Sequence, residues 1–489
     1  MFDYSMQDNA IRIINEGAKT AMSNTEFIVA EIREFRKSPK YRAMINGQNY
    51  YDGKHDILNK KRTVIGEDGK LTEVMNLPNS KQIDNQYKKA IKQKVNYFVG
   101  KPFTVQCENE AYIELLSQYF NKGFMRTIKN VCKDSLNGGI GWLYPYYDEN
   151  GEFKFKKFKP YEIIAGWKDA DHTELDYAIR VYDVEAYEGT RKTTITKVEY
   201  YTVNGIDFYE LHDQQLIPCE PYHIDYFSIN DKSYNWNKIP LVAFKYSEEE
   251  IPLICNVKSL QDGLNTIISN FQDNMQEDMR NTILVLVNYD GTNLGEFRRN
   301  LATYGAVKVR NDSSGAGGDV KTLQIEVNAE NYKALIEIFK KAIIENCLSY
   351  DAKDERMSGT PNQMNIQSMY NDIDIDANDM ETEYQASMEE LLWFINMHLS
   401  NTGQGDYEGE TVEFIFNRDM MMNEADVITN IQNSVGILST ETLIAQHPWV
   451  SDPQEELTKL EAEKQKMMEQ YGDAFGGEPA DEESEDDEV

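Results

Sequence analysis

The sequence predicts a mainly helical α+β protein built from several domains. Three observations support this prediction: a length of 489 residues, a section in which apolar residues alternate, and long helical stripes on both sides of that section. A chain of this length exceeds one ordinary hydrophobic core. Its hydrophobic residues (40%) and aromatic residues (11%) supply enough apolar material for a folded body.

The predicted N-terminal part, residues 1–250, begins with helices. The first helical pattern ends at a turn, Asp52-Gly53, and a basic, irregular stretch, HDILNKKRTV, follows it. A second pattern stops at Gly100 and Pro102, as a helix does at a C′ glycine and a following proline. The stripe of this second helix comprises Ile83, Tyr87, Ala90, Ile91, Lys94, Val95 and Phe98.

From Gly141 to about Tyr246 the apolar period changes to two, which predicts an antiparallel β-rich region. Turn signals at Asn150-Gly151 and Asn204-Gly205 lie between runs of β-prone residues, a pattern typical of β-hairpins. The first 250 residues are therefore expected to combine N-terminal helices with a β-rich subdomain.

Two helices that enclose a small insert are predicted next. Residues 251–280 and 328–350 are helical, and residues 281–327 form an α/β unit with strand-like ends and a glycine-rich loop. The two stripes comprise Ile254, Val257, Leu260, Leu264, Ile267, Phe271, Met275 and Met279, and then Tyr332, Leu335, Phe339, Ile343 and Asn346.

A polar loop at residues 351–365 separates the second of these helices from a much longer one at 366–400. A plain helical hairpin closes with about two to five loop residues, so this loop is longer than closure requires. The helix after it would span about 50 Å, at about 1.5 Å per residue. Its stripe comprises Ile366, Met369, Tyr370, Ile373, Ala377, Met380, Tyr384, Met388, Leu391, Ile395 and Leu399.

The C-terminal part is predicted to be mainly helical. Residues 401–420 contain a returning strand, and residues 421–475 form helices, one of which starts at Asp452-Pro453 with an N-cap Asp and a Pro at the first helical position. Residues 476–489 are predicted to be a disordered acidic tail, because they have too little apolar surface to offset the entropy cost of ordering.

The charge balance argues against tight, sequence-independent binding of DNA. The formal net charge is −33, and it is still −25 without the eight acidic residues of the last twelve, EPADEESEDDEV. Non-specific DNA binding needs Lys and Arg to displace counterions. A partner that slides past the protein without being held is compatible with this balance, and so is simple solubility.

Cysteine spacing and hydropathy indicate a soluble protein that is assembled inside a cell. The five cysteines show no CxxC or CxxH spacing, so reduced and mostly buried thiols are expected. No apolar run approaches the roughly 20 residues that span a bilayer. The first residues, MFDYSMQDNAIRI, lack the features of a signal peptide, and no membrane association is expected.

Neither a metal site nor a catalytic site is predicted. Asp372, Asp374, Asp376 and Glu383 have EF-hand spacing, but Ala377 occupies the position that needs glycine, so a solvated helix face is expected. The glycine-rich NDSSGAGGDV lacks the Gly-Lys-Ser/Thr of a phosphate-binding loop. The six histidines are dispersed without HExxH spacing, although distant residues can still form a triad. We expect no enzyme activity and no cofactor.

Two groups of basic residues stand out in this acidic chain. Lys353 and Arg356 lie in the long polar loop, and Arg298, Arg299, Lys308 and Arg310 lie in the insert between two helices. Ordinary surface charge explains such residues in most proteins. Their positions, in a long loop and in a unit held by two helices, favour a binding role.

Four stretches make the chain resemble the portal proteins of bacteriophages, most closely those of long-tailed phages of Gram-positive bacteria. The stretches are YYDGKHDILNKK, NSKQIDNQYKKAIKQKVNYFVGKPF, the loop and long helix from MSGTPNQMNIQSMYNDIDI to ETEYQASMEELL, and GILSTETLIAQHPWVSDPQEELTKLEAEK. NYFVGKPF is similar to the YxxGKP signature of the family, and the resemblance covers nearly the whole chain from Tyr51 onward.

The resemblance implies a head-to-tail connector at one capsid vertex: a homo-oligomeric ring, a dodecamer, through which double-stranded DNA is packaged and ejected. It implies a portal fold with a β-rich wing (1–250 and 401–420), a two-helix stem (251–280 and 328–350) and an α/β clip (281–327). A tunnel loop (351–365), a long wing helix (366–400) and a helical crown (421–475) complete it. The implied location is the virion, with the host cytoplasm during assembly.

The implied partners are the DNA, the terminase large subunit, the major capsid and scaffold proteins, and a head-completion adaptor. In such a ring the tunnel loop faces the DNA, and the clip, with Arg298, Arg299, Lys308 and Arg310, docks partners. The DNA-facing residues would be Lys353, Arg356, Ser358, Gly359, Thr360, Pro361, Asn362 and Gln363. Two alternatives stay open: another phage head–tail ring or scaffold-like interaction protein, and a cytosolic enzyme with an unrecognised site.

Overall fold

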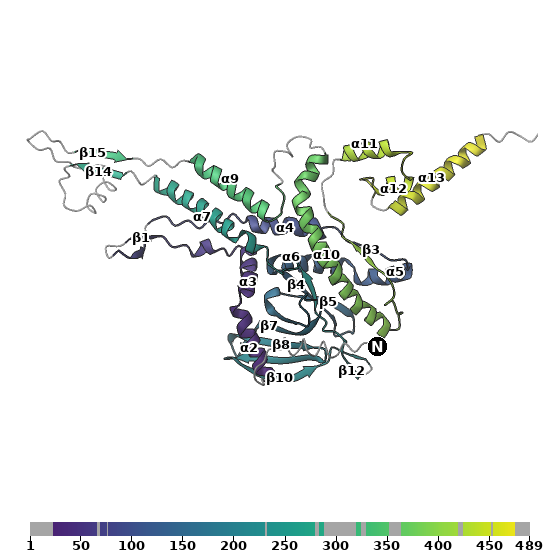
Figure 1. Cartoon of the computed structure of the whole chain (residues 1–489), viewed down its shortest axis with the longest axis horizontal. Coiled ribbons are helices and arrows are strands. Elements are labelled where there is room, and N and C mark those ends of the chain that lie inside the picture. Colours follow the sequence, from purple (N-terminus) through teal and green to yellow (C-terminus); the bar gives the residue numbers. More distant parts are fainter. Residues whose placement is uncertain are drawn as a thin grey trace, which may run out of the picture. The chain divides into compact units, whose positions relative to one another are not determined.

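A computed structural model of the chain is shown in Figure 1. It describes residues 23–65, 69–75, 77–229, 232–278, 283–287, 319–323, 329–351, 363–418, 424–450 and 453–474. The chain divides into two compact units. Unit 1 comprises Met1–Asp351 and Asp372–Asp419, and unit 2 comprises Ala352–Asn371 and Met420–Val489.

Two helices separated by Ser38 begin the described part of unit 1. α2 (Asn24–Lys37) starts in a capping box, and Ser38, in an extended conformation, ends α2 and caps α3 (Pro39–Tyr51). The turn predicted at Asp52-Gly53 is confirmed, with a φ of 84° at Gly53. The stretch expected to be irregular instead contains η1 (Asp56–Asn59) and β1 (Thr63–Ile65), which pairs with β2 (Leu71–Glu73).

α4 (Gln86–Val99) ends where the sequence predicts, but for a different reason. Gly100 has a φ of −72°, so it is not the left-handed C′ glycine that was expected. A Cβ atom at this position would lie 2.0 Å from the carbonyl oxygen of Asn96, so the absence of a side chain is what the position requires. β3 (Thr104–Gln106), α5 (Glu110–Tyr119) and α6 (Lys122–Gly138) follow.

Two antiparallel sheets form the predicted β-rich region, with strand orders β13-β4-β5 and β10-β9-β8-β7-β6. The hairpin expected at Asn204-Gly205 is present, but its turn lies one residue earlier because Thr202 pairs with Gly205. The strands are β4 (Ile140–Tyr147), β5 (Phe153–Phe158), β6 (Ile163–Trp167), β7 (Leu175–Glu188), β8 (Arg191–Thr202), β9 (Gly205–His212), β10 (Gln215–Ile224) and β13 (Val242–Lys245). The short η2 (Pro160–Glu162) precedes β6, and β11 (Phe227–Ile229) pairs with β12 (Lys232–Tyr234).

Apolar side chains join these sheets to the N-terminal helices. Ile28 and Ile32 of α2 pack with Ile179 and Val198 of the five-stranded sheet. A second cluster is built around Trp142 of β4 and includes residues of both sheets. Figure 1 shows α2 lying beside the strands that it covers.

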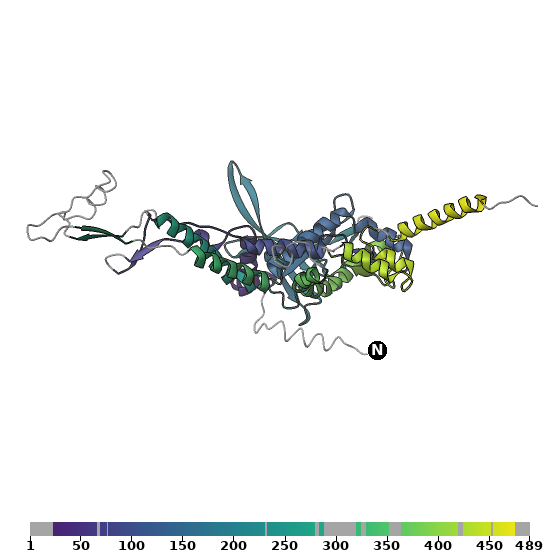
Figure 2. The ribbon, with the colours of Figure 1, turned by 90° about the horizontal axis from the view of Figure 1, so that it is seen from above.

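α7 (Ile254–Asp278) and α9 (Ala329–Asn346) lie side by side (Figures 1 and 2). They approach closely at Gly263, where an added Cβ would lie 2.6 Å from the Phe339 ring. β14 (Ile283–Val287) pairs with β15 (Asp319–Leu323), so the two strands of the predicted insert that the structure describes form an antiparallel pair.

α7 buries a polar stripe that the apolar pattern did not predict. Gln261, Asn265, Ser269 and Asp273 have exposed fractions of 0%. They face the segment that leads into α4 and accept hydrogen bonds from the backbone N–H groups of Ser80, Gln82, Asp84 and Gln86. The spacing of donors and acceptors is similar, because four helical residues rise about 6 Å and two residues of an extended chain span about 6.6 Å.

α10 (Gln363–Asn401) confirms the prediction of a long helix. All eleven residues of its predicted stripe are buried, with exposed fractions of 6% or less. The helix passes from unit 2 into unit 1 between Asn371 and Asp372. The returning strand is β16 (Glu413–Ile415), which pairs with β3.

The remaining described helices belong to unit 2. They are α11 (Glu424–Ser434), α12 (Thr440–Ala445) and α13 (Pro453–Ala474). α13 starts at Pro453 as predicted, whereas Asp452 and the predicted acidic tail lie outside the described residues. The mixed helix and sheet content agrees with the predicted α+β class.

Candidate functional site

The predicted DNA-facing residues lie almost entirely outside the part of the chain that the structure describes. Gln363, the first residue of α10, is the exception. The four basic residues of the insert, Arg298, Arg299, Lys308 and Arg310, also lie outside it. The structure therefore does not place either group, but it does describe the end of α9 that leads into the predicted loop.

A buried lysine of α4 holds this end of α9 against α10. Lys94 has an exposed fraction of 1%, and its Nζ lies 2.5 Å from Asp376 Oδ2. The same ammonium donates a hydrogen bond to the carbonyl oxygen of Leu348, at 3.2 Å. Tyr246 donates from its hydroxyl to Asp376 Oδ1, at 2.6 Å. One ion pair therefore links α4, α10 and the residues directly after α9.

Gln93, the neighbour of Lys94, fixes the next two residues. Its Nε2 donates to the carbonyl oxygen of Tyr350 at 3.0 Å, and its Oε1 accepts from Ser349 Oγ at 2.7 Å. Leu348 has a φ of 46°, a left-handed conformation that is costly for a residue with a side chain. We call Gln93, Lys94, Asp376 and Tyr246 the anchor, because together they hold residues 348–350.

Burial dominates the electrostatics of the anchor. Removal from water lowers the pKa of Lys94, while the Asp376 carboxylate acts in the opposite direction. Burial, followed by the Asp376 charge, raises the pKa of the Tyr246 hydroxyl above its usual range. The ion pair and the hydrogen bonds from Lys94 to Leu348 and from Tyr246 to Asp376 offset the cost of placing these charges in the interior.

Sequence reasoning missed the anchor, although it placed Lys94 in the right helical stripe. A lysine at a predicted buried position is the signal that a partner carboxylate is needed. Asp376 was expected on a solvated helix face, and this prediction was wrong because its exposed fraction is 5%. Residues 372–383 are helical throughout, so they do not form an EF-hand loop, and Asp374 is paired with Arg418.

α7 and α9 expose apolar side chains near the C-terminal end of α7 and in the middle of α9. Met275, Leu335 and Ile338 have exposed fractions of 48%, 43% and 61%. The two helices contact each other through Phe271 and Tyr332, whose ring centroids lie 4.9 Å apart. Only part of each predicted apolar stripe is therefore covered within the described residues of one chain.

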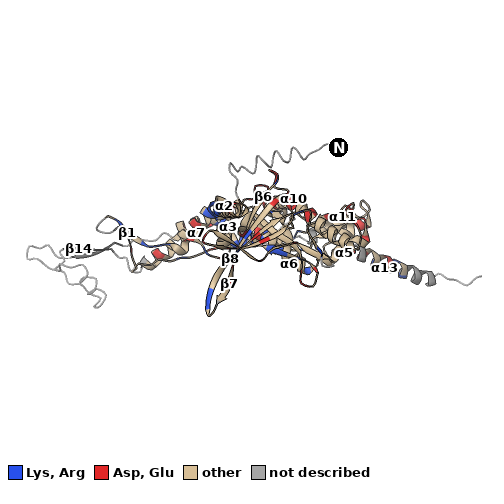
Figure 3. Cartoon of the chain, turned by 90° about the horizontal axis from the view of Figure 1, so that it is seen from below, with Lys and Arg blue, Asp and Glu red and all other residues tan. Residues whose placement is uncertain are grey.

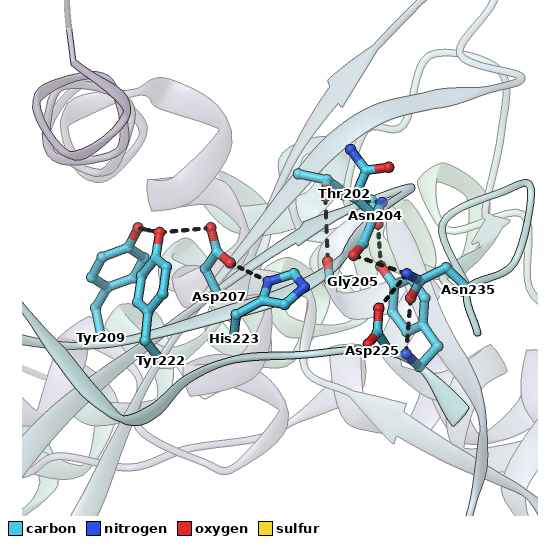
Figure 4. Close-up of polar contacts among 10 residues, drawn as sticks. Thr202, Asn204, Gly205, Asp207, Tyr209, Tyr222, His223, Asp225 and Asn235 are labelled. Carbon is cyan, nitrogen blue, oxygen red and sulfur yellow. Dashed lines mark hydrogen bonds and ion pairs between the residues drawn. The ribbon is translucent and has the colours of Figure 1, made fainter. Parts of the chain in front are cut away.

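His212 Nε2 lies 3.3 Å from Oε2 of Glu210, two residues away, and two further histidines have carboxylate partners that are distant in sequence. His223 Nδ1 lies 2.6 Å from Asp207 Oδ1, and Asp207 Oδ2 accepts a hydrogen bond from Tyr222 (Figure 4). His172 Nδ1 lies 2.7 Å from Glu250 Oε1. Among the described residues, neither imidazole has a hydrogen bond with a Ser, Thr or Cys side chain, so neither pair has the third member of a nucleophilic triad.

Other features bear on the remaining predictions. No group of three potential metal ligands occurs within the described residues. No helix in that part of the chain is long and apolar enough to cross a bilayer. All five cysteines are free, but only Cys132 and Cys347 are buried, so the prediction of mostly buried thiols was wrong. Burial raises the pKa of each of these two thiols to about 12, which keeps them protonated.

Comparison with known proteins gives matches along most of the chain. Residues 36–470 match the family model described as "Phage portal protein, SPP1 Gp6-like". The chain is 28% identical over 489 residues to the portal protein of Bacillus phage SPP1, an alignment that covers 97% of this chain and 93% of that protein. It is 27% identical over 436 residues to the portal protein of Clostridium phage phiCD119, with 87% and 93% covered.

Solved structures give more distant likenesses. One is a chain of the structure titled "Virion of native gene transfer agent (GTA) particle", with 12% identity, a TM-score of 0.37, and 73% of this chain and 88% of that chain covered. Another belongs to "Neck of native GTA particle computed with C12 symmetry", with 12% identity, a TM-score of 0.38, and 74% and 88% covered.

Proposed function

Because this chain belongs to the family of phage portal proteins of the SPP1 type, we propose that it forms a closed ring at one vertex of the capsid. Double-stranded DNA passes through this ring during packaging and ejection. Portal proteins are structural components of the phage virion, and the ring is assembled in the host cytoplasm before it becomes part of the capsid. The family match along residues 36–470 carries this proposal.

The proposal assigns a role to each part of the chain. Residues 1–250 with 401–420 form the wing, α7 and α9 form the stem, and residues 281–327 form the clip. Residues 351–365 form the tunnel loop, α10 is the wing helix, and residues 421–475 form the crown. In a ring, the exposed apolar side chains of α7 and α9 meet neighbouring subunits, which explains why one chain leaves Met275, Leu335 and Ile338 exposed.

A dodecamer is the proposed assembly, and the clip is the proposed docking surface for other proteins. The terminase large subunit binds it during packaging, and a head-completion adaptor binds it afterwards. Arg298, Arg299, Lys308 and Arg310 supply the positive charge for these contacts. Capsid and scaffold proteins contact the outside of the ring.

The anchor gives the tunnel loop a fixed starting point. Lys94 and Gln93 hold Leu348, Ser349 and Tyr350, so the loop begins at the same place in every subunit. Lys353 and Arg356 follow within six residues and make weak phosphate contacts that break as the DNA advances. A chain with a net charge of −33 adds little counterion-release energy to hold the duplex, which suits a passage.

The first experiment is electron microscopy of the purified protein in negative stain. Closed rings with a central channel are expected. A protein that stays monomeric, in solution and after production together with its scaffold protein, contradicts the proposal.

The second experiment tests the conduit with Lys353→Ala combined with Arg356→Ala. The double variant should assemble into rings and enter capsids normally, but a packaging assay should yield less nuclease-protected DNA. Replacement of residues 358–363 by a short Gly-Ser turn tests the loop itself. Normal DNA packaging and retention by both variants would show that the segment is only a connector.

A further inference from the structure

α4 and α6 present a strip of cations on the surface of an otherwise acidic protein. Lys122, Arg126, Lys129 and Lys133 follow one another at steps of four, three and four residues, so they share one face of α6. Lys88 and Lys92 are one turn apart on α4, which contains no acidic residue. We call these six residues the basic strip. Figure 3 shows blue segments along α6.

Tyr51 joins the two halves of the basic strip. The Nζ atoms of Lys88 and Lys133 lie 5.1 Å and 5.8 Å from the centroid of its ring. Lys133 also has a carboxylate partner, Asp134, at 3.5 Å. Within the described part of the chain, none of the other five cations forms a salt bridge. Most of the positive charge of the strip is therefore available to a partner.

A groove with the opposite charge lies along α10. It has a volume of about 400 Å³ and is lined by the carboxylates of Glu389, Asp406, Glu408 and Glu410 and by apolar side chains that include Trp393 and Met397. Glu410 accepts a hydrogen bond from Asn109, at 2.8 Å. Among the described residues, none of the four carboxylates forms a salt bridge. We call this the acidic groove.

The basic strip and the acidic groove lie on opposite sides of unit 1. Inside the unit, Ser135 of α6 and Tyr384 of α10 share a hydrogen bond of 2.9 Å, so these two residues mark the sides on which the helices face each other. At about 100° per residue, the strip lies roughly opposite Ser135 on α6, and Glu389, Trp393 and Met397 lie roughly opposite Tyr384 on α10. Figures 2 and 3 agree, with α10 on one side of the unit and α6 towards the other.

We propose that the basic strip of one subunit docks in the acidic groove of the next subunit, as a head-to-tail contact between copies of this chain. The inference rests on the proposed ring and names the surfaces that close it. A head-to-tail ring needs two different, complementary surfaces that one chain presents in different directions. The strip and the groove meet both conditions, because their charges are opposite and they point away from each other.

Charge complementarity favours a second copy of this chain, and not a nucleic acid, as the partner of these surfaces. DNA would explain the basic strip but would leave the acidic groove without a partner, because carboxylates repel the phosphates of DNA. A second copy explains both surfaces at once. Apolar lining next to the carboxylates also suits lysine and arginine side chains, whose aliphatic stems pack on such surfaces while their charged ends reach the carboxylates.

The test uses two charge-reversed proteins and their mixture. The strip variant carries Arg126→Glu and Lys129→Glu, and the groove variant carries Glu389→Lys and Glu408→Lys. Each variant alone would bring like charges together at every contact, so the ring fraction in size-exclusion chromatography and microscopy should fall at least about tenfold. When the two are produced in one cell with different affinity tags, alternation restores opposite charges at every contact, and mixed rings should form.

Controls separate this contact from folding and from the proposed function. Arg36→Glu with Lys37→Glu makes the same charge change on exposed residues of α2 and should leave the rings intact. Far-UV circular dichroism and thermal midpoints of both variants should match those of the wild type. If either variant forms rings alone, or if the mixture fails to restore them, the contact is wrong. If the wild type forms no rings, the proposed function itself fails.

Discussion

α7 and α10 are the two longest helices in the described part of the chain, and the sequence predicts an apolar stripe on each, yet they bury different groups. α10 packs its stripe against other side chains, and all eleven predicted residues are buried. The most buried face of the middle of α7 is polar and packs against backbone. Hydrophobic periodicity identifies helix faces that pack against apolar side chains. It does not identify a helix face whose polar side chains accept hydrogen bonds from backbone N–H groups.

The largest loss of stability is expected from a substitution in the apolar face of α10. Tyr384 is fully buried, and its ring lies 5.1 Å from the rings of both Phe98 and Phe244. Tyr384→Ala should lower the free energy of unfolding by about 4 kcal/mol, because it leaves a large cavity. Chemical denaturation measures the change. Tyr384→Phe, which removes only the hydroxyl that bonds Ser135, should cost about 1 kcal/mol, and equal losses for the two variants would show that packing is not the cause.

Breaking the anchor should have the next largest effect. Lys94→Met leaves the buried Asp376 carboxylate without its cation, and should lower the free energy of unfolding by about 3 kcal/mol. Lys92→Met, an exposed position on the same helix, is the matched control and should change it by less than about 0.5 kcal/mol.

A second substitution sharpens the prediction for the anchor. Asp376→Leu in the Lys94→Met background removes the orphaned carboxylate and should recover much of the lost stability. If the double variant is less stable than Lys94→Met alone, Asp376 stabilises the fold independently of Lys94.

A substitution in the polar face of α7 should lower the free energy of unfolding less than a substitution in the anchor does. Gln261→Leu removes the oxygen that accepts from the N–H groups of Gln86 and Tyr87, at 3.0 Å and 3.1 Å. Leaving these groups unsatisfied should cost about 2 kcal/mol, although leucine is the more apolar side chain. Gln276→Leu, an exposed position on the same helix, is the control. A stability gain from Gln261→Leu would mean that the polar stripe does not hold the segment.

The same contrast explains what the sequence could and could not predict. The long helix, the β-rich region and the helix over residues 86–99 were predictable because apolar side chains repeat with a clear period. The anchor was not, because Lys94 and Asp376 are 282 positions apart and each looks ordinary in its own segment. The polar stripe was hidden because Gln261, Asn265, Ser269 and Asp273 read as a solvated face. Apart from Gln363, the predicted contact residues of the loop and insert lie outside the described residues, and the roles of all of them remain predictions.

The smallest expected effect depends on pH and concerns a carboxylate on α10. Burial raises the pKa of Glu390 to about 7, while the Lys238 charge lowers it and the Glu174 charge raises it. The raised pKa means that the folded protein binds this proton more tightly than the unfolded chain, whose carboxyl has a pKa near 4.5. The contribution to stability is therefore favourable in acid, declines as the pH rises from about 5 to 7, and is lost above 7.

Glu390→Gln removes this titration and tests its sign. At pH 8 the variant should be more stable than the wild type by about 1 kcal/mol, because glutamine avoids the cost of a buried charge. At pH 5 the two proteins should have nearly equal stability. Exposed Glu389, changed to Gln, is the matched control and should show no such pH dependence. If instead the wild type gains stability relative to Glu390→Gln between pH 5 and 8, Glu390 is held as a charged partner of Lys238. This part of α10 would then resemble the anchor, where a carboxylate is ion-paired with a lysine, and not the apolar stripe.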